Sequence, residues 1–178
     1  MRNLEFKAAF DDLQRGKQIA GAMGATAGGD LHQVDTYFRV PEGRLKLREI
    51  NHAAGELIFY RRPEAEAVRF SNYYTAPVGD SAAMVNVLSL SLGTRIRIEK
   101  VRRLYIYRGA RIHLDRVPDL GNFVEFEVPV ASDEPASEAV ARGIMDELMR
   151  AFGLRADDAI KASYSEMAEA SRQPIIGQ

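Results

Sequence analysis

The sequence predicts an α+β fold in which an antiparallel sheet is either strongly curved or closed into a barrel. Segments that alternate apolar and polar residues, the period of a strand, recur about eight times along the chain. Short turns separate several of them, which favours antiparallel neighbours because parallel strands need long crossovers. A few further segments have helical periodicity, so strands and helices are expected to pack together in one α+β unit.

Five predicted strands lie in the first 80 residues. The first occupies 3–8 and is followed by a helix from Asp11 to about Met23. The Gly-rich segment 24–30 is expected to be a loop, and it lacks the Lys followed by Ser or Thr that a phosphate-binding P-loop needs. Pro41-Glu42-Gly43 is typical of a hairpin turn. The other predicted strands occupy 34–40, 43–49, 56–62 and 66–76.

Another helix and three more strands follow. Asp80 or Ser81 can cap a helix that extends to about Leu92 and ends at Gly93. A hairpin around Arg108-Gly109 then joins strands at 94–107 and 110–117, and a further strand covers 122–130.

The C-terminal segment is predicted to be helical. Ser132-Asp133-Glu134-Pro135 starts an amphipathic helix with Ile144, Leu148 and Phe152 on one side, and Gly153 ends it. A last helix is expected at about 156–171. We expect a single domain over residues 1–178, with an ordered core at about 1–170 and a frayed tail at 172–178.

The composition excludes several classes of protein. The formal net charge is −1, from 24 Lys and Arg against 25 Asp and Glu, so we expect no nucleic-acid partner. No apolar run approaches the ~18–20 residues that cross a bilayer, and the N-terminus lacks a signal-peptide pattern, so we expect no membrane partner. The absence of cysteine excludes disulfides and thiolate metal sites and agrees with a cytoplasmic location.

The stretch Gly-Arg-Leu-Lys-Leu-Arg-Glu, at 43–49, raises the question of which strand face points inward. As a strand it places Arg44, Lys46 and Arg48 on one face and Leu45 and Leu47 on the other. In a sandwich or half-open sheet, the cations would face water. In a closed barrel, they would instead face an enclosed space built to hold an anion.

The charges segregate by strand, which favours the enclosed alternative. Cations dominate at 44–48, at 61 and at 100–103, whereas Glu125 and Glu127 form an acidic pair on one strand face. Two carboxylates at this spacing can converge on a hard cation such as Mg²⁺ or Mn²⁺. Without cysteine or clustered histidine, such oxygen ligands favour these metals over Zn²⁺.

One predicted strand has no consistent polar face. Ile96 and Ile98 share parity with Lys100 and Arg102, so its charged face changes near Glu99. A β-bulge or a strand end at this point would explain the change.

Several motifs resemble one known family. Asn3-Leu4-Glu5-Phe6-Lys7 is similar to the Glu-x-Glu-x-Lys signature of the CYTH superfamily, the triphosphate tunnel metalloenzymes. The resemblance covers about residues 1–170, and the pattern is most similar to the class IV adenylyl cyclase-like branch, with thiamine triphosphatases more distant. The other matching motifs, in order, are DTYF at 35–38, GRLKLRE at 43–49, ELIFYRRP at 56–63, EKVRR at 99–103, RIHLDRV at 111–117 and LGNFVEFEV at 120–128.

The resemblance implies an eight-stranded antiparallel barrel that forms a charged tunnel with helices packed outside. Its metal-binding positions match Glu5, Glu125 and Glu127, for Mg²⁺ or Mn²⁺. Asp115 matches an acidic position near the reacting centre and, with Lys100 and Arg102, forms the expected catalytic set. The positions expected to bind a triphosphate are Lys7, Lys46, Arg48, Arg61, Lys100, Arg102 and Arg111.

The implied function is a metal-dependent reaction on ATP, thiamine triphosphate or tripolyphosphate. An adenylyl cyclase would form cyclic AMP and pyrophosphate, and a triphosphatase would hydrolyse its substrate. The first signature Glu is replaced by Asn3, which supplies no charge, so a non-catalytic polyphosphate- or nucleotide-binding protein is the alternative. The sequence does not decide between a monomer and a homodimer. The seven expected cations exceed the four expected carboxylates by three, a surplus that a bound polyphosphate would offset.

Overall fold

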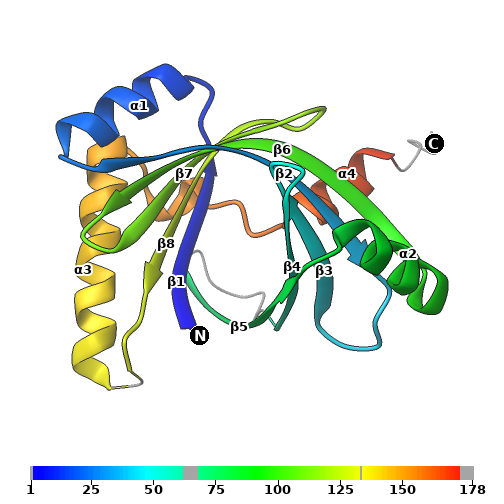
Figure 1. Cartoon of the computed structure of the whole chain (residues 1–178). Coiled ribbons are helices and arrows are strands. Elements are labelled where there is room, and N and C mark those ends of the chain that lie inside the picture. Colours follow the sequence, from blue (N-terminus) through cyan, green and yellow to red (C-terminus); the bar gives the residue numbers. More distant parts are fainter. Residues whose placement is uncertain (1, 62–67, 133, 173–178) are drawn as a thin grey trace, which may run out of the picture.

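The computed structural model describes residues 2–61, 68–132 and 134–172, and within them eight antiparallel strands close into a barrel (Figure 1). The strands are β1 (Arg2–Ala9), β2 (Thr26–Phe38), β3 (Arg44–Ile50), β4 (Ala54–Arg61), β5 (Arg69–Val78), β6 (Thr94–Tyr107), β7 (Ala110–Val117) and β8 (Gly121–Pro129). Their order around the barrel is β1-β5-β4-β3-β2-β6-β7-β8. The predicted α+β class and the eight-stranded barrel are confirmed.

Helices flank the barrel. They are α1 (Leu13–Ala22), α2 (Ser81–Leu92), α3 (Pro135–Phe152) and α4 (Tyr164–Arg172), with a short 3-10 helix, η1 (Ala156–Asp158). The Asp12 carboxylate caps α1 by accepting from the Arg15 backbone N–H at 2.9 Å, and Asp80 caps α2 in the same way. Gly153, in the left-handed region at φ 70°, ends α3 as predicted.

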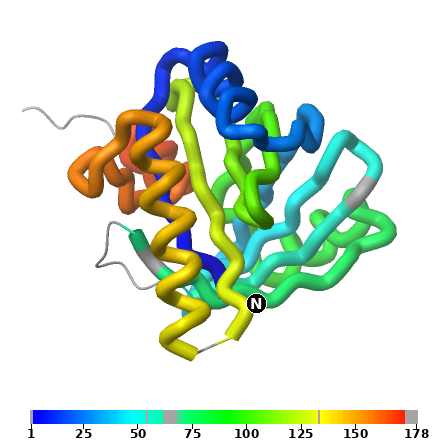
Figure 2. The backbone as a smooth tube through the Cα atoms, turned by 90° about the vertical axis from the view of Figure 1, so that its left-hand side faces the viewer, coloured from blue at the N-terminus to red at the C-terminus, as the bar shows by residue number. Residues whose placement is uncertain are grey.

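The main hydrophobic core lies outside the barrel, between β1, β7 and β8 and the helices α1 and α3. Figure 2 looks onto α3, which runs beside β8. The Phe126 ring stacks on Phe6 at 5.9 Å between centroids and meets Phe152 edge-on at 5.1 Å. All three rings are buried, and truncating one such core phenylalanine to alanine typically costs about 3–5 kcal/mol. On β1, β7 and β8 the outward faces are therefore the apolar ones.

The same alternation turns charged residues inward. On β3, Leu47 is completely buried on the outer side, whereas Lys46 and Arg48 line the interior. On β8, Val124 and Phe126 pack outward and Glu125 and Glu127 point inward. Lys46 and Arg48 of the stretch at 43–49 thus face an enclosed space, whereas Arg44 pairs with Glu166 of α4.

One end of the barrel interior is apolar. Ile96 and Ile98 of β6 pack there with Phe123, and α4 covers them with Tyr164 and Ala168. The expectation of a β-bulge or a strand end near Glu99 is wrong, because β6 continues through this point and pairs with β2 in unbroken register at Ile98, Glu99 and Lys100. The strand keeps one inward face, which is apolar under α4 and charged beyond it.

Two predicted elements differ from the structure. Residues 26–30 were expected to be a loop but belong to β2. The strand accommodates its glycines through a β-bulge between Ala27 and Gly29. Gly29 adopts φ 92°, which glycine permits without strain. The last helix was predicted from 156 but forms only at Tyr164. Ahead of it, Ala159 bridges Ala8, and the Ile160 N–H donates to the Lys7 carbonyl at 2.7 Å, which draws the chain out along β1.

Some predictions fall outside the described residues: residue 62 of one predicted strand, residues 66–67 of the next, Asp133 and the tail beyond 172. Among the described helices, none has the length and apolar character needed to cross a membrane.

Candidate functional site

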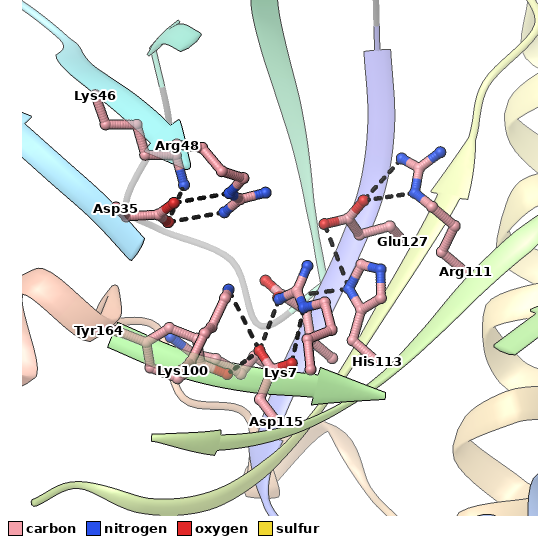
Figure 3. A network of polar contacts seen from close by, with 12 residues as sticks. Lys7, Asp35, Lys46, Arg48, Lys100, Arg111, His113, Asp115, Glu127 and Tyr164 are labelled. Carbon is pink, nitrogen blue, oxygen red and sulfur yellow. Dashed lines mark hydrogen bonds and ion pairs between the residues drawn. The ribbon is translucent and has the colours of Figure 1, made fainter. Parts of the chain in front are cut away.

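The barrel encloses a cavity of about 380 Å³ to which all eight strands contribute side chains. Figure 3 shows the network of polar contacts among the charged residues of this cavity. Because neighbouring strands are in register, inward residues on adjacent strands meet directly. Asp35 of β2 pairs with Arg48 of β3, and Arg102 of β6 pairs with Asp115 of β7. The polar contacts inside the barrel follow from this register.

The first group of charges, here called the basic wall, consists of Asp35, Lys46 and Arg48. Arg48 holds the Asp35 carboxylate in a bidentate contact, with Nε–Oδ1 at 2.7 Å and Nη2–Oδ2 at 2.8 Å, and Lys46 Nζ donates to Oδ2 at 2.7 Å. Burial opposes ionisation of Asp35, yet the two cations hold its pKa well below the usual range. One carboxylate therefore serves two cations.

A central cluster joins the two sides of the cavity. Arg102 binds Asp115 through two contacts of 2.7 and 2.6 Å, and its Nη2 also donates to Glu125 at 2.6 Å. The Tyr164 hydroxyl donates to Asp115 at 3.0 Å, and Lys100 Nζ lies 3.5 Å from the same oxygen. Burial, together with the charge of Arg102, lowers the pKa of Lys100 to about 7. Near neutral pH, Lys100 can therefore hold or release a proton.

The second group, here called the acidic wall, consists of His113, Glu125 and Glu127. His113 Nδ1 lies 3.7 Å from a carboxylate oxygen of each glutamate. That nitrogen is buried and has no hydrogen-bond partner among the described residues. Burial and the nearby Arg102 charge lower the pKa of His113, which keeps the imidazole neutral. Burial opposes ionisation of Glu125, but the charges of Arg102 and Lys100 hold its pKa well below the usual range.

The acidic wall suits a divalent cation. One ligand atom from each of His113, Glu125 and Glu127 lies within 4.8 Å of the others. An unpartnered buried nitrogen is costly unless something binds it, and a neutral imidazole beside two carboxylates is a common metal-ligand set. Glu5, opposite Glu127 in the β1–β8 register, also lines the cavity. Glu125 and Glu127 were expected as ligands, and the structure places His113 beside them.

Charges around the cavity balance. Among the described residues, six cations and six carboxylates surround it: Lys7, Lys46, Arg48, Lys100, Arg102 and Arg111, against Glu5, Asp35, Glu56, Asp115, Glu125 and Glu127. The expected surplus of three cations is therefore wrong. Asp35 and Glu56 point inward, and Arg61 points outward.

Arg61 is the expected triphosphate ligand that the structure places outside the cavity. On β4, Ile58 and Tyr60 line the interior, so Arg61 has the opposite parity. Its side chain is 69% exposed and pairs with Glu42 at 3.0 Å. Strand alternation places Arg61 on the same face as Phe59, and that face is the outer one.

Asn3 and Lys7 both lie on the inward face of β1. The Asn3 amide oxygen accepts from Arg111 Nη2 at 2.9 Å, and its nitrogen donates to the Arg2 carbonyl at 3.2 Å; these partners determine the orientation of the amide. Asn3 thus accepts a hydrogen bond from Arg111 but supplies no negative charge to the site. Lys7 donates to the Ala162 carbonyl, and its ammonium lies 4.5 Å from the centre of the Tyr164 ring.

Asp35 and Tyr164 are among the residues of the site that were missed in the sequence. Asp35 was part of a recognised motif, and its parity with the other inward residues of β2 could have indicated its position. Tyr164 gave no signal, because its contact with Asp115 joins residues 49 positions apart through the fold of α4.

Solved structures resemble this barrel. A Pyrococcus horikoshii protein has a TM-score of 0.81 and 22% identity, over 92% of this chain and 98% of that one. A Vibrio parahaemolyticus protein described as a proposed adenylate cyclase has a TM-score of 0.78 and 19% identity, over 94% and 97% of the chains.

A third structure is a Hippeastrum protein described as a proposed adenylyl cyclase with a dominant triphosphatase activity. It has a TM-score of 0.64 and 15% identity, over 99% of this chain and 100% of that one. At these identities the likeness shows the fold. A search among curated proteins found no match. The model of the CYTH domain matches residues 1–164, and the chain therefore belongs to the CYTH domain family.

Proposed function

We propose that this protein is a Mg²⁺- or Mn²⁺-dependent enzyme that acts on the triphosphate of a nucleotide or another organic triphosphate. The observation that carries the proposal is the pairing, within one cavity, of a cation-rich wall with a carboxylate–imidazole wall. Phosphoryl chemistry depends mainly on positioning and on stabilising the charge of the phosphoryl oxygens, and the two walls supply both.

The chain's cations would bind the phosphates. Arg48 and Arg102 offer planar forks that suit phosphate oxygens, and Lys46 and Lys100 add compact charge. In the described structure Arg48 and Lys46 hold Asp35, so a phosphate would share these donors with the carboxylate. Lys7 and Arg111 line the same cavity and extend the set.

The acidic wall would hold the metal through His113, Glu125 and Glu127, with Glu5 beside them. A metal bound there would neutralise phosphate charge and lower the barrier to attack at phosphorus. Arg102 and Arg111 contact the two glutamates directly, so they would orient these carboxylates and also reach toward the phosphates.

The central cluster would exchange protons with the reacting groups and hold Arg102 and Lys100 in position. Lys100, with its pKa near 7, would take up or release a proton during the reaction. Asp115 is fully buried behind Arg102 and would act as a positioning residue for Arg102 and Lys100. In a cyclase, the ribose 3′-hydroxyl attacks the α-phosphorus and pyrophosphate leaves. In a hydrolase, water attacks the terminal phosphorus. The class IV cyclase resemblance favours the first reaction.

A substrate panel tests the proposal. Purified protein is incubated with ATP, thiamine triphosphate or tripolyphosphate, with Mg²⁺, Mn²⁺ or EDTA, and the products are separated. We expect metal-dependent turnover of at least one substrate. Cyclic AMP with pyrophosphate would identify a cyclase, and ADP with phosphate a hydrolase. No turnover of any substrate with either metal would refute an enzymatic function.

The second candidate, a non-catalytic polyphosphate- or nucleotide-binding protein, is motivated by Asn3. Asn3 replaces a signature carboxylate and binds Arg111. This candidate expects tripolyphosphate binding by calorimetry with no product after long incubation. Metal-dependent turnover that disappears in Glu125→Gln would exclude it.

A further inference from the structure

A second hollow lies on the outer face of β4 and β5. This outer groove, about 730 Å³ in volume, is bordered by Arg2, Phe59, Arg61, Asn72, Tyr73 and Tyr74. Phe59 and Tyr74 face each other in the β4–β5 register, as do Arg61 and Asn72. Adjacent aromatic and guanidinium side chains therefore share one strip of surface.

Two of these side chains are unusually open to solvent. Tyr74 is 72% exposed, although most of the chain's aromatic residues are buried or half-buried. The Arg61 guanidinium lies 6.0 Å from the centre of the Phe59 ring. Its ion pair with Glu42 is exposed on both sides and therefore contributes little stability. Exposed aromatic rings and arginine planes are the groups on which nucleobases stack.

The groove adjoins the cavity. Tyr73 lines both spaces, because its strand passes between them. Near Tyr73 the cavity is lined by Asn3, Ser71 and Arg111, and the Asn3–Arg111 contact lies on this side. A ligand whose phosphates lie against Arg111 could thus continue past Tyr73 into the groove.

We propose that the outer groove binds the base of a nucleoside triphosphate whose phosphates occupy the cavity, with Tyr74 and Arg61 stacking on the base. This inference rests on the proposed function, because it needs the phosphates in the cavity. It narrows the substrate from any triphosphate to a nucleoside triphosphate. It also gives Arg61 a role at the base, where the sequence had suggested a phosphate contact.

Binding of ATP and of tripolyphosphate tests the proposal, measured by calorimetry with EDTA present so that metal-dependent turnover cannot consume either ligand. We expect Tyr74→Ala to weaken ATP binding about tenfold, the usual effect of removing one stacking ring, and to leave tripolyphosphate binding unchanged. Tyr74→Phe, which keeps the ring, should bind ATP as the parent does. Leu90→Ala, at a 90% exposed position on α2, is the matched control for removing an exposed apolar side chain far from the groove in sequence.

The outcomes separate the two proposals. If the parent binds ATP no more tightly than tripolyphosphate, or if Tyr74→Ala weakens both equally, the base site is refuted and triphosphate binding in the cavity stands. If Tyr74→Ala changes neither ligand, the base site is also refuted. If the parent binds neither ligand in EDTA and turns over no substrate of the panel with Mg²⁺ or Mn²⁺, the proposed function fails and the base site with it.

Discussion

The two walls of the cavity contain similar groups in opposite proportions. On the basic wall, two cations share the single carboxylate of Asp35. On the acidic wall, Glu125 and Glu127 flank an imidazole whose Nδ1 finds no hydrogen-bond partner in the part of the chain that the structure describes. The cations and the carboxylate of the basic wall pair with one another. The glutamates of the acidic wall instead pair with Arg102 and Arg111, and among the described residues the His113 Nδ1 atom has no hydrogen-bond partner. The difference indicates that the acidic wall is built to receive a cation.

The pairing also explains how the barrel stays folded with charges inside. Isolated buried charges cost several kcal/mol each, and the balanced set around this cavity avoids that cost. Ligand binding then becomes an exchange of partners. Phosphate oxygens would replace or share the Asp35 contacts, and a metal would share the glutamates with the arginines.

Arg48→Met should have the largest effect. It removes the bidentate partner of the buried Asp35 carboxylate, and losing one member of a buried pair typically costs about 3 kcal/mol or more. Urea unfolding should show this loss, and calorimetry should show that tripolyphosphate binding is lost.

The double variant Asp35→Asn/Arg48→Met is the control for Arg48→Met, because it removes the carboxylate as well as its partner. It should recover most of the stability without recovering binding. An Arg48→Met protein as stable as the parent would show that the basic wall does not depend on this pair.

Glu125→Gln should lower metal-dependent turnover by about a hundredfold or more at fixed Mn²⁺, because it removes a proposed ligand and the partner of Arg102. Activity is measured as a function of Mn²⁺ concentration. Glu99→Gln, at an exposed carboxylate that contacts His32, is the control and should behave as the parent does. Equal activity in both variants would remove Glu125 from the metal site.

The pH dependence of binding should report Lys100. Its pKa in the folded protein, about 7, lies below the ordinary 10.5, so between these values the unfolded chain binds more protons. The stability of the empty barrel should therefore rise with pH across this window. An anion beside Lys100 favours its charged form, so tripolyphosphate binding at pH 8 should take up about one proton.

Calorimetry in buffers of different ionisation enthalpy measures this uptake. Lys100→Met should abolish it, and should also flatten the rise of stability with pH. Proton uptake that persists in Lys100→Met would assign the titration to another group.

Tyr164→Phe should have the smallest effect. It removes the hydroxyl that donates to Asp115 at 3.0 Å while keeping the ring beside Lys7 and Lys100. We expect a loss of about 1 kcal/mol in unfolding free energy and a few-fold loss of activity. Tyr107→Phe, whose hydroxyl contacts Glu147 on the outside of the barrel, is the control for stability alone. A Tyr164→Phe protein that matches Tyr107→Phe in activity would show that α4 does not support the site.

Much of the fold could be predicted because local signals and tertiary structure agree. The caps at Asp12 and Asp80, and the hairpin around Arg108-Gly109, act over a few residues and were recognisable in the sequence. Prediction failed at residues 26–30, where glycines that usually indicate a loop accommodate a bulge in β2. It failed again at 156–163, where pairing with β1 overrides helical propensity.

The sequence by itself determined the two-residue period of each strand, and with it which side chains share a face. It grouped Lys46 with Arg48 and Glu125 with Glu127, and the structure keeps both groups together. A period of two cannot say which face points inward, because both faces of a strand are equivalent until the sheet closes. Closure of the barrel turned Arg61 outward and Asp35 inward, and the folding of α4 over one end brought Tyr164 to Asp115. These contacts join distant segments, so only the tertiary structure could decide them.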